Sequence, residues 1–430
     1  MKNEDNKKAI GLVSAMALGI GGMIGAGIFA VLGIATNIVG NLVYLSFLFA
    51  GMIALLSTYS YAKLSSTYPS AGGPVEFLIR GFGDGVSSGG FNFLLYFGYV
   101  FVLAVYAEAF GSYAATVLPP EYSKIGMDIF AILIIVIFTL INFLGPKVVG
   151  KSETLIVGIK VAILTIFAIF GVFFIKPHLL SISMPNVGNI LTGAGLLFLG
   201  YEGFGLITNT AEDIKNPRKN IPRALYLSVL LVMVIYIAVS IVVVGTLSLP
   251  DIAKSADYVL ASAAATFAGS IGFTIMVIAA LFSTSSAINA TLYGGANVSY
   301  LMAKKGQLPD FFNRKFWIDS KEGLLITSIL VLLLILSLNL SNIAMMGSAA
   351  FLLIYTGVNL AHLKLYKETG ANKYIIYLAI LGGLFSFSVL AYYEIFNSPI
   401  TLIILCVVIL FSFMFEWTYR KFSTRVLKTR

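Results

Sequence analysis

The sequence predicts an all-α integral membrane protein with twelve transmembrane helices. Three observations support this class: the composition, the recurrence of apolar segments of bilayer-spanning length, and the placement of the basic residues. Of 430 residues, 59% are hydrophobic and only 11% are charged, with a mean hydropathy of +0.95. A soluble globular domain is about 45–50% apolar and about 25% charged. The composition therefore excludes a soluble enzyme, a secreted domain and a disordered chain.

Apolar segments of spanning length follow one another along the whole chain, so we expect one membrane domain over residues 1–430. A helix needs about 20 apolar residues to cross a bilayer. The runs lack the period-two alternation of a β-barrel, and the first is too long and glycine-rich for a cleavable signal peptide. The predicted spans are 10–35, 43–64, 91–117, 129–144, 154–175, 190–210, 224–246, 271–293, 324–340, 344–365, 374–393 and 400–415.

The basic residues set the predicted orientation. With both termini on one side, all but four of the 28 Lys and Arg residues fall on that side. The exceptions are Lys124, Lys176 and Lys254 on the opposite side, and Lys160 within a span. Because basic loops are retained in the cytoplasm, we expect a multi-pass plasma-membrane protein with both termini cytoplasmic. The net charge of +9 thus reflects topology, and no nucleic-acid partner is needed to explain it.

Residues suited to cofactors or catalysis are scarce. The single Cys406 excludes a disulfide framework and a thiolate metal site, and two histidines, His178 and His362, exclude a haem or zinc centre built on imidazole. We therefore expect no cofactor and no metal. The chain has no HExxH or GxSxG motif and no appreciable extramembrane domain, which disfavours an intramembrane enzyme and a receptor.

Two spans have compositions that disfavour a continuous helix. The first carries five glycines from Gly19 to Gly27, and in the sixth glycines recur from Gly193 to Gly205. Each interior glycine costs about 1 kcal/mol relative to alanine, and unpaired backbone inside a bilayer is tolerated where it lines a cavity. The alternative is close packing of helices through small residues.

The positions of these two spans, first and sixth, indicate two five-helix repeats of inverted topology. The repeats would be residues 10–175 and 190–365, followed by two additional helices in 374–415. A broken helix offers N–H groups suited to a carboxylate at one end and carbonyls suited to an ammonium at the other. A site that presents both ends matches a zwitterion.

Ionisable residues inside spans are functional candidates because of their cost there. Lys160 lies about seven residues into the fifth span, roughly 10 Å deep. Burial disfavours its charged form, so it could bind and release a proton near neutral pH. The alternative is a permanently charged lysine that clamps backbone carbonyls or extends to the membrane surface.

Other polar residues allow more than one reading. Glu202 lies at the predicted break of the sixth span, where it could pair with a substrate cation, carry a proton or bind freed N–H groups. Glu108 lies toward the outer end of the third span, which we expect to be more accessible to water. Ser283 and Ser286 share a face of the eighth span and could complete a sodium site, contact a neighbouring helix or meet Lys160. A lysine and a sodium ion would compete for one cation site, so Lys160 favours protons.

The 33 Phe and 22 Tyr residues are expected mostly to face lipid or the membrane interface. Only Phe198 and Tyr201, beside the glycine-rich break of the sixth span, are predicted to be site residues.

Several segments together carry a family resemblance. They are 22–29 (GMIGAGIF), 61–64 (YAKL) with 69–74 (PSAGGP), 142–145 (NFLG), 150–153 (GKSE), 212–223 (EDIKNPRKNIPR), 285–291 (SSAINAT) and 305–309 (KGQLP). Over essentially its full length the chain resembles the amino acid–polyamine–organocation transporter superfamily, and within it a proton-coupled archaeal amino acid transporter of broad specificity. The resemblance implies a leucine-transporter-like 5+5 inverted repeat with helices 1 and 6 unwound.

The resemblance also implies roles for particular residues. Lys160 stands where a fifth-helix lysine replaces the second sodium of this fold. Phe198 is near an occluding aromatic, and Leu196 stands where arginine exchangers have a gate tryptophan, which argues against an arginine exchanger. The N–H groups around Gly25, Ala26 and Gly27 would bind the substrate carboxylate, the carbonyls of Met23, Leu196 and Leu199 would bind its ammonium, and Ile24, Gly200 and Tyr201 would complete the site.

The expected function is proton-coupled import of amino acids by alternating access, with neutral side chains favoured. The expected partners are an amino acid, a proton and the lipid bilayer, and nothing in the sequence indicates an oligomeric state. The alternative is an amino acid or amine exchanger of the same fold in which Lys160 is only structural.

Overall fold

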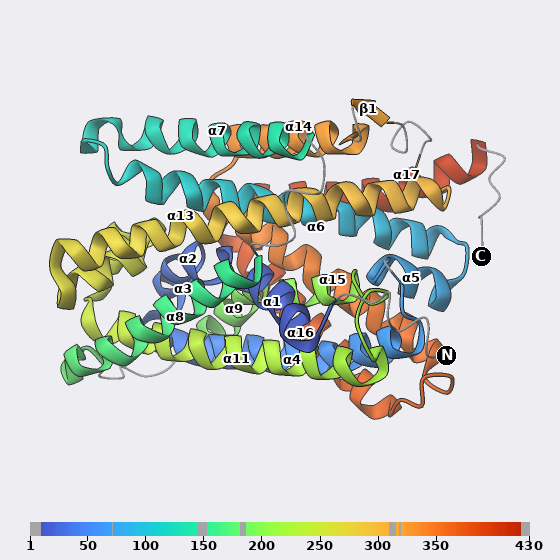
Figure 1. Ribbon diagram of the computed structural model, residues 1–430, viewed down its shortest axis with the longest axis horizontal. Coiled ribbons are helices and arrows are strands. Elements are labelled where there is room, and N and C mark those ends of the chain that lie inside the picture. The colour runs from blue at the N-terminus through green and yellow to red at the C-terminus, as the bar shows by residue number, and fades with distance from the viewer. Residues whose placement is uncertain are drawn as a thin grey trace.

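The computed structural model describes residues 10–70, 72–143, 153–180, 186–308, 315–317 and 320–422. In this part of the chain long helices lie alongside one another, and one small hairpin of β1 (Lys315–Trp317) and β2 (Ser320–Lys321) accompanies them (Figure 1). The helices are α1 Leu12–Met23, α2 Ala26–Phe29, α3 Leu32–Val39, α4 Val43–Thr67, α5 Pro74–Phe82, α6 Val86–Ala115, α7 Ser123–Phe143, α8 Glu153–Gly171, α9 Val187–Leu197, α10 Gly205–Thr208, α11 Pro217–Thr246, α12 Leu249–Lys254, α13 Val259–Lys304, α14 Glu322–Ser337, α15 Leu340–Leu365, α16 Lys373–Asn397 and α17 Pro399–Phe422.

The all-α membrane class predicted from composition is confirmed. Within the described residues, eleven helical segments are long and apolar enough to cross a bilayer. The predicted ninth span, 324–340, corresponds to α14, which has 16 residues and is shorter than the about 20 that a full crossing needs. The exact number of twelve spans therefore stays a prediction.

Two predicted spans differ from the helices observed. The first, 10–35, is divided into α1, α2 and the start of α3 by two short interruptions. The eighth, 271–293, is part of the longer α13, which bends at Gly269 (φ 59°) and continues to Lys304. A helix that leaves the bilayer no longer needs apolar side chains, so hydropathy underestimates its length. The family segments around 144–152 and Pro309 lie outside the described residues.

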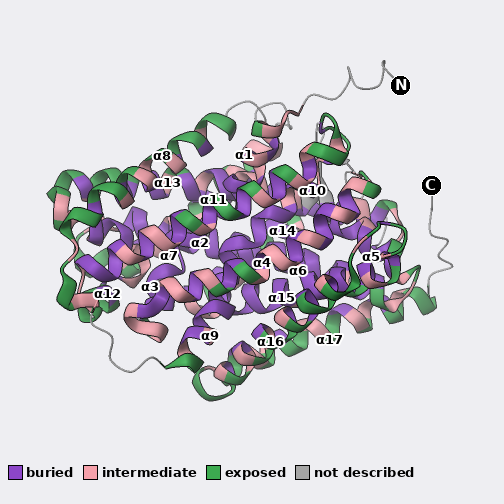
Figure 2. Ribbon diagram, turned by 90° about the horizontal axis from the view of Figure 1, so that it is seen from below, coloured by how far each residue is buried: buried purple, intermediate pink, exposed green. Residues whose placement is uncertain are grey.

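The helices divide into a buried centre and an apolar exterior. Buried residues gather in the middle of the bundle and exposed ones at its periphery (Figure 2). Peripheral helices nevertheless expose large apolar side chains, including Leu155 (69% exposed) on α8 and Leu381 (63%) on α16. Such continuous apolar exposure suits lipid and not water.

Two backbone hydrogen bonds join the start of the first helical segment to a part of the chain that is distant in sequence. The N–H of Ile10 donates to the carbonyl of Asp213 (3.1 Å), and the N–H of Lys215 donates to the carbonyl of Ile10 (2.9 Å). These bonds place the beginning of α1 beside the connection between α10 and α11.

Candidate substrate and coupling site

The first helical segment is interrupted where its glycines cluster. Helix α1 ends at Met23, Ile24 caps it with φ −80° and ψ 43°, and α2 begins at Ala26. The turn is held tightly, because a Cβ on Gly25 would lie 2.6 Å from the Cβ of Ala287 on α13. A larger residue at this position would push the turn away from α13.

The sixth predicted span differs from an unwound helix. Helix α9 passes into a seven-residue 3₁₀ helix, Phe198–Phe204, and then into α10. A 3₁₀ run longer than three or four residues is uncommon and often marks a hinge or a strained sequence. The glycines of this segment thus favour a tighter helix that keeps local i→i+3 hydrogen bonds, and the prediction of unwinding is wrong in this respect.

Glycines bring the interrupted first segment and the 3₁₀ segment into backbone contact. A Cβ on Gly27 would lie 2.5 Å from the Cα of Gly200, and a Cβ on Gly22 would lie 3.1 Å from the Cα of Gly203. Only glycine allows this approach at both points. Close packing through small residues, the alternative interpretation of these glycines, therefore also occurs. The glycines interrupt the first segment, and they also allow it to pack against the 3₁₀ segment.

Three buried tyrosines contact backbone carbonyls at this junction. The hydroxyl of Tyr236 (α11) lies 2.5 Å from the Met23 carbonyl and 3.2 Å from that of Gly200, and the hydroxyl of Tyr106 (α6) donates to the Gly22 carbonyl at 3.0 Å. Tyr355 (α15) donates to the backbone carbonyl of Glu202.

These tyrosines were missed by sequence reasoning. The expectation that aromatic residues outside Phe198 and Tyr201 mostly face lipid or the interface is wrong for Tyr106, Tyr236 and Tyr355, which are at most 3% exposed. The available signal was their position deep in apolar spans, since a hydroxyl in hydrocarbon requires a hydrogen-bond partner.

The predicted site residues at the end of α9 and in the 3₁₀ segment have different neighbours. Phe198 is fully buried and packs edge-on against Tyr355, with ring centroids 5.6 Å apart. Tyr201 donates to the Phe47 carbonyl of α4 at 3.0 Å. Leu196 is fully buried, and Leu199, also buried, lies near Gly347 of α15, where a Cβ would approach its Cδ1 to 3.2 Å. The segment thus contacts α4 and α15 as well as α1 and α2.

Both predicted intramembrane glutamates are buried. Glu202 is 3% exposed, and one of its carboxylate oxygens lies 3.4 Å from the Tyr106 hydroxyl. Glu108 is 1% exposed, so its expected wet surroundings are wrong: α6 is enclosed by other helices on this side. Its second carboxylate oxygen has no hydrogen-bond partner among the described residues.

Lys160 is connected to the interruption of the first segment through one residue. Its ammonium donates to the backbone carbonyl of Ser283 (3.2 Å), and the hydroxyl of Ser283 donates to the carbonyl of Ile24. Lys160 is 3% exposed, and Ser286 lies one turn further along α13. Of the alternatives predicted for Ser283, contact with a neighbouring helix and with Lys160 is therefore what the structure shows.

The arrangement has the features of a membrane carrier. The interrupted first segment meets the 3₁₀ segment at glycines deep in an apolar bundle, and a buried lysine contacts α13, the helix that touches the interruption. The chain belongs to the amino acid permease family, whose model, described as "Amino acid permease", matches residues 10–415.

Three relatives are similar over most of their length. An uncharacterised protein of Methanocaldococcus jannaschii is 38% identical over 98% of each chain. The inner membrane transport protein YbaT of Escherichia coli is 35% identical over 89% of this chain and 90% of its own. The methylthioribose transporter of Bacillus subtilis is 28% identical over 72% and 70%. The family consists of transporters, so the chain is a transport protein and not an enzyme, and the family resemblance of the sequence is confirmed.

The Tyr236 hydroxyl supplies the first testable consequence. Tyr236→Phe leaves two buried carbonyls with one partner fewer, and we expect the free energy of unfolding to fall by about 1 kcal/mol and transport to fall several-fold. Thermal denaturation in detergent and vesicle uptake measure both. Tyr374→Phe, on an exposed side chain of α16, is the matched control, and equal behaviour of the two variants would contradict a role for Tyr236.

Proposed function

We propose that this protein imports amino acids together with protons by alternating access. The observation that carries the proposal is the chain of contacts from Lys160 through Ser283 to Ile24. A change of charge on Lys160 alters its bond to the Ser283 carbonyl, and Ser283 itself holds the carbonyl at which α1 ends. Proton binding would in this way favour one of the two conformations of the α1–α2 interruption that alternating access requires.

The amino acid would bind between the interrupted first segment and the 3₁₀ segment. Its carboxylate would meet the N–H groups of Gly25, Ala26 and Gly27, since helix N-termini attract anions. Its ammonium would meet the carbonyls of Met23, Leu196 and Leu199. The Met23 carbonyl already accepts from Tyr236, and a carbonyl has two lone pairs, so it can hold the ammonium as a second donor. Ile24, Gly200 and Tyr201 would complete the site.

The proposal includes the arrangement of the whole chain. Twelve spans would form two inverted repeats, 10–175 and 190–365, with two additional helices in 374–415. Both termini would be cytoplasmic in the plasma membrane, because basic residues concentrate on their side. Glu202 and Ser286 would be neighbours of the coupling site.

The substrate class can be tested by ligand-induced stabilisation. Each amino acid, with methylthioribose as an outside comparison, is added to the purified protein at an acidic and at a neutral pH. A ligand that binds only the folded state raises the melting temperature. We expect small and medium neutral amino acids to do so, because glycines, leucines and Phe198 form the proposed pocket. Stabilisation by none of the amino acids at either pH would contradict the proposal.

The second candidate is an exchanger without proton coupling, in which the Lys160–Ser283 contact only holds α8 against α13. Counterflow of labelled amino acid in proteoliposomes that does not respond to a pH gradient would favour the exchanger. Uptake that an inward proton gradient drives would favour the symporter.

A further inference from the structure

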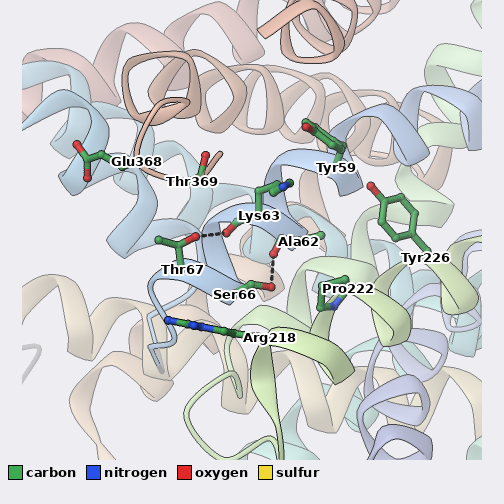
Figure 3. A pocket seen from close by; sticks show the side chains of 10 residues that line it. All are labelled: Tyr59, Ala62, Lys63, Ser66, Thr67, Arg218, Pro222, Tyr226, Glu368 and Thr369. Carbon is green, nitrogen blue, oxygen red and sulfur yellow. Dashed lines mark hydrogen bonds between the residues drawn. The ribbon is translucent and has the colours of Figure 1, made fainter. Parts of the chain in front are cut away.

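A pocket with no lining residue from α1, α2 or the 3₁₀ segment opens where α4, α11 and the connection between α15 and α16 meet. Its volume is about 620 Å³. Figure 3 shows Lys63 near its centre, with Tyr59 and Tyr226 to one side and Glu368 on the other. The pocket lies at the end of the molecule where the basic residues of the chain gather, the end we assign to the cytoplasm.

The pocket has a cationic mouth and an aromatic interior. Lys63 and Arg218 line it from α4 and α11, beside the hydroxyl-bearing Ser66. Tyr59 and Tyr226 are further from the cytoplasmic ends of the same helices, one turn inward from Lys63 and two from Arg218. An occupant would therefore meet positive charge outside and tyrosine rings inside.

The one acidic side chain of the pocket lining has a partner of its own. Glu368 accepts a hydrogen bond from the Tyr68 hydroxyl. Desolvation and the Glu368 carboxylate raise the pKa of Tyr68 to about 12, so the hydroxyl stays protonated and keeps donating to Glu368. Lys63 donates to the neutral Gly370 carbonyl at 3.2 Å, so the pocket lining holds two basic side chains, Lys63 and Arg218, against the single carboxylate of Glu368.

The walls of the pocket continue toward the middle of the bilayer as lipid-exposed stripes. On α4, Met52 (49% exposed) and Phe49 (40%) follow Tyr59 at helical spacing. On α11, Leu230 (41%) follows Tyr226 one turn further. A ligand that fills the pocket with a polar head can extend apolar chains along these stripes without leaving the protein surface.

We propose that this pocket binds the phosphate group of an anionic phospholipid from the cytoplasmic leaflet, with the acyl chains along the exposed stripes of α4 and α11. Charge complementarity selects an anionic lipid, since each basic residue near the membrane surface contributes about 1 kcal/mol toward anionic lipids, a fivefold change in affinity. The apolar stripes select a lipid over a soluble phosphate.

Binding of defined lipids to the purified, delipidated full chain tests this site. Affinities for dioleoyl phosphatidylglycerol, dioleoyl phosphatidylcholine and glycerol phosphate are measured by native mass spectrometry and by the rise in melting temperature. We expect tight binding of phosphatidylglycerol only. The double variant Lys63→Gln/Arg218→Gln should bind it about 30-fold more weakly.

Lys219→Gln is the matched control, because it removes one exposed charge from the same turn of α11 outside the pocket lining. If the double variant does not fold, Arg218→Gln alone, on an exposed side chain, should weaken binding about fivefold. Unchanged affinity in the Arg218 and double variants, or an equal loss in Lys219→Gln, overturns the site. If glycerol phosphate raises the melting temperature as much as phosphatidylglycerol does, the assignment of the ligand as a lipid is overturned.

Discussion

Replacing Lys160 by alanine is expected to abolish the response of uptake to an imposed pH gradient while substrate binding persists. The side chain lies about seven residues into the predicted fifth span, and its contact with Ser283 links it to Ile24. Removing the amine removes the group that changes charge but leaves the backbone carbonyls and N–H groups of the interrupted segment in place. Gradient-driven uptake into proteoliposomes and ligand-induced stabilisation separate the two effects.

Two variants serve as controls for this experiment. Lys176→Ala removes a lysine outside the spans and should keep full proton-driven uptake. Glu108→Gln removes a second buried ionisable group, the carboxyl of Glu108, from the membrane interior. If Lys160→Ala retains gradient-driven uptake and Glu108→Gln loses it, Lys160 is not the coupling residue.

Replacing Gly27 by alanine is expected to reduce transport at least tenfold and to lower the melting temperature. The added Cβ would lie 2.5 Å from the Cα and 2.9 Å from the carbonyl oxygen of Gly200, and it would also collide with the Tyr236 hydroxyl. Overpacking typically costs about 1–3 kcal/mol, and backbone atoms cannot be relieved by a rotamer change. The two segments would have to separate.

Gly158→Ala is the matched control, since a Cβ there meets no heavy atom within 4 Å although the residue lies two positions from Lys160. In a helix it should be neutral or slightly stabilising. Transport by Gly27→Ala at the rate of Gly158→Ala would show that the contact between the segments is not needed for the transport cycle.

Some features of the site could be predicted because the residues that form them carry a free-energy cost. Three features each carry a free-energy cost unless a specific environment offsets it, so each is visible in the sequence. They are the apolar runs of spanning length, the glycine cluster and the buried lysine. The interruption at Ile24 and Gly25 lies within the predicted glycine cluster, and Lys160 lies beside Ser283.

Other features could not be predicted because they depend on which face of a helix points inward. Helix α6 is apolar and buried on nearly all sides, so hydrophobic periodicity does not reveal that Tyr106 and Glu108 face other helices. Likewise, glycine content predicts a weakened helix at 198–204 but does not distinguish an unwound segment from the 3₁₀ helix that forms.

The pair of backbone hydrogen bonds at Ile10 joins the start of α1 to the connection that leads into α11. Lys215, which donates to Ile10, is three residues before Arg218, a residue of the pocket wall. Any tilt of α1 that keeps these bonds must pull on the same stretch of chain that forms one side of the pocket. A displacement of the start of α1 that keeps these two hydrogen bonds therefore also displaces the N-terminal end of α11, which carries Arg218 in the pocket lining.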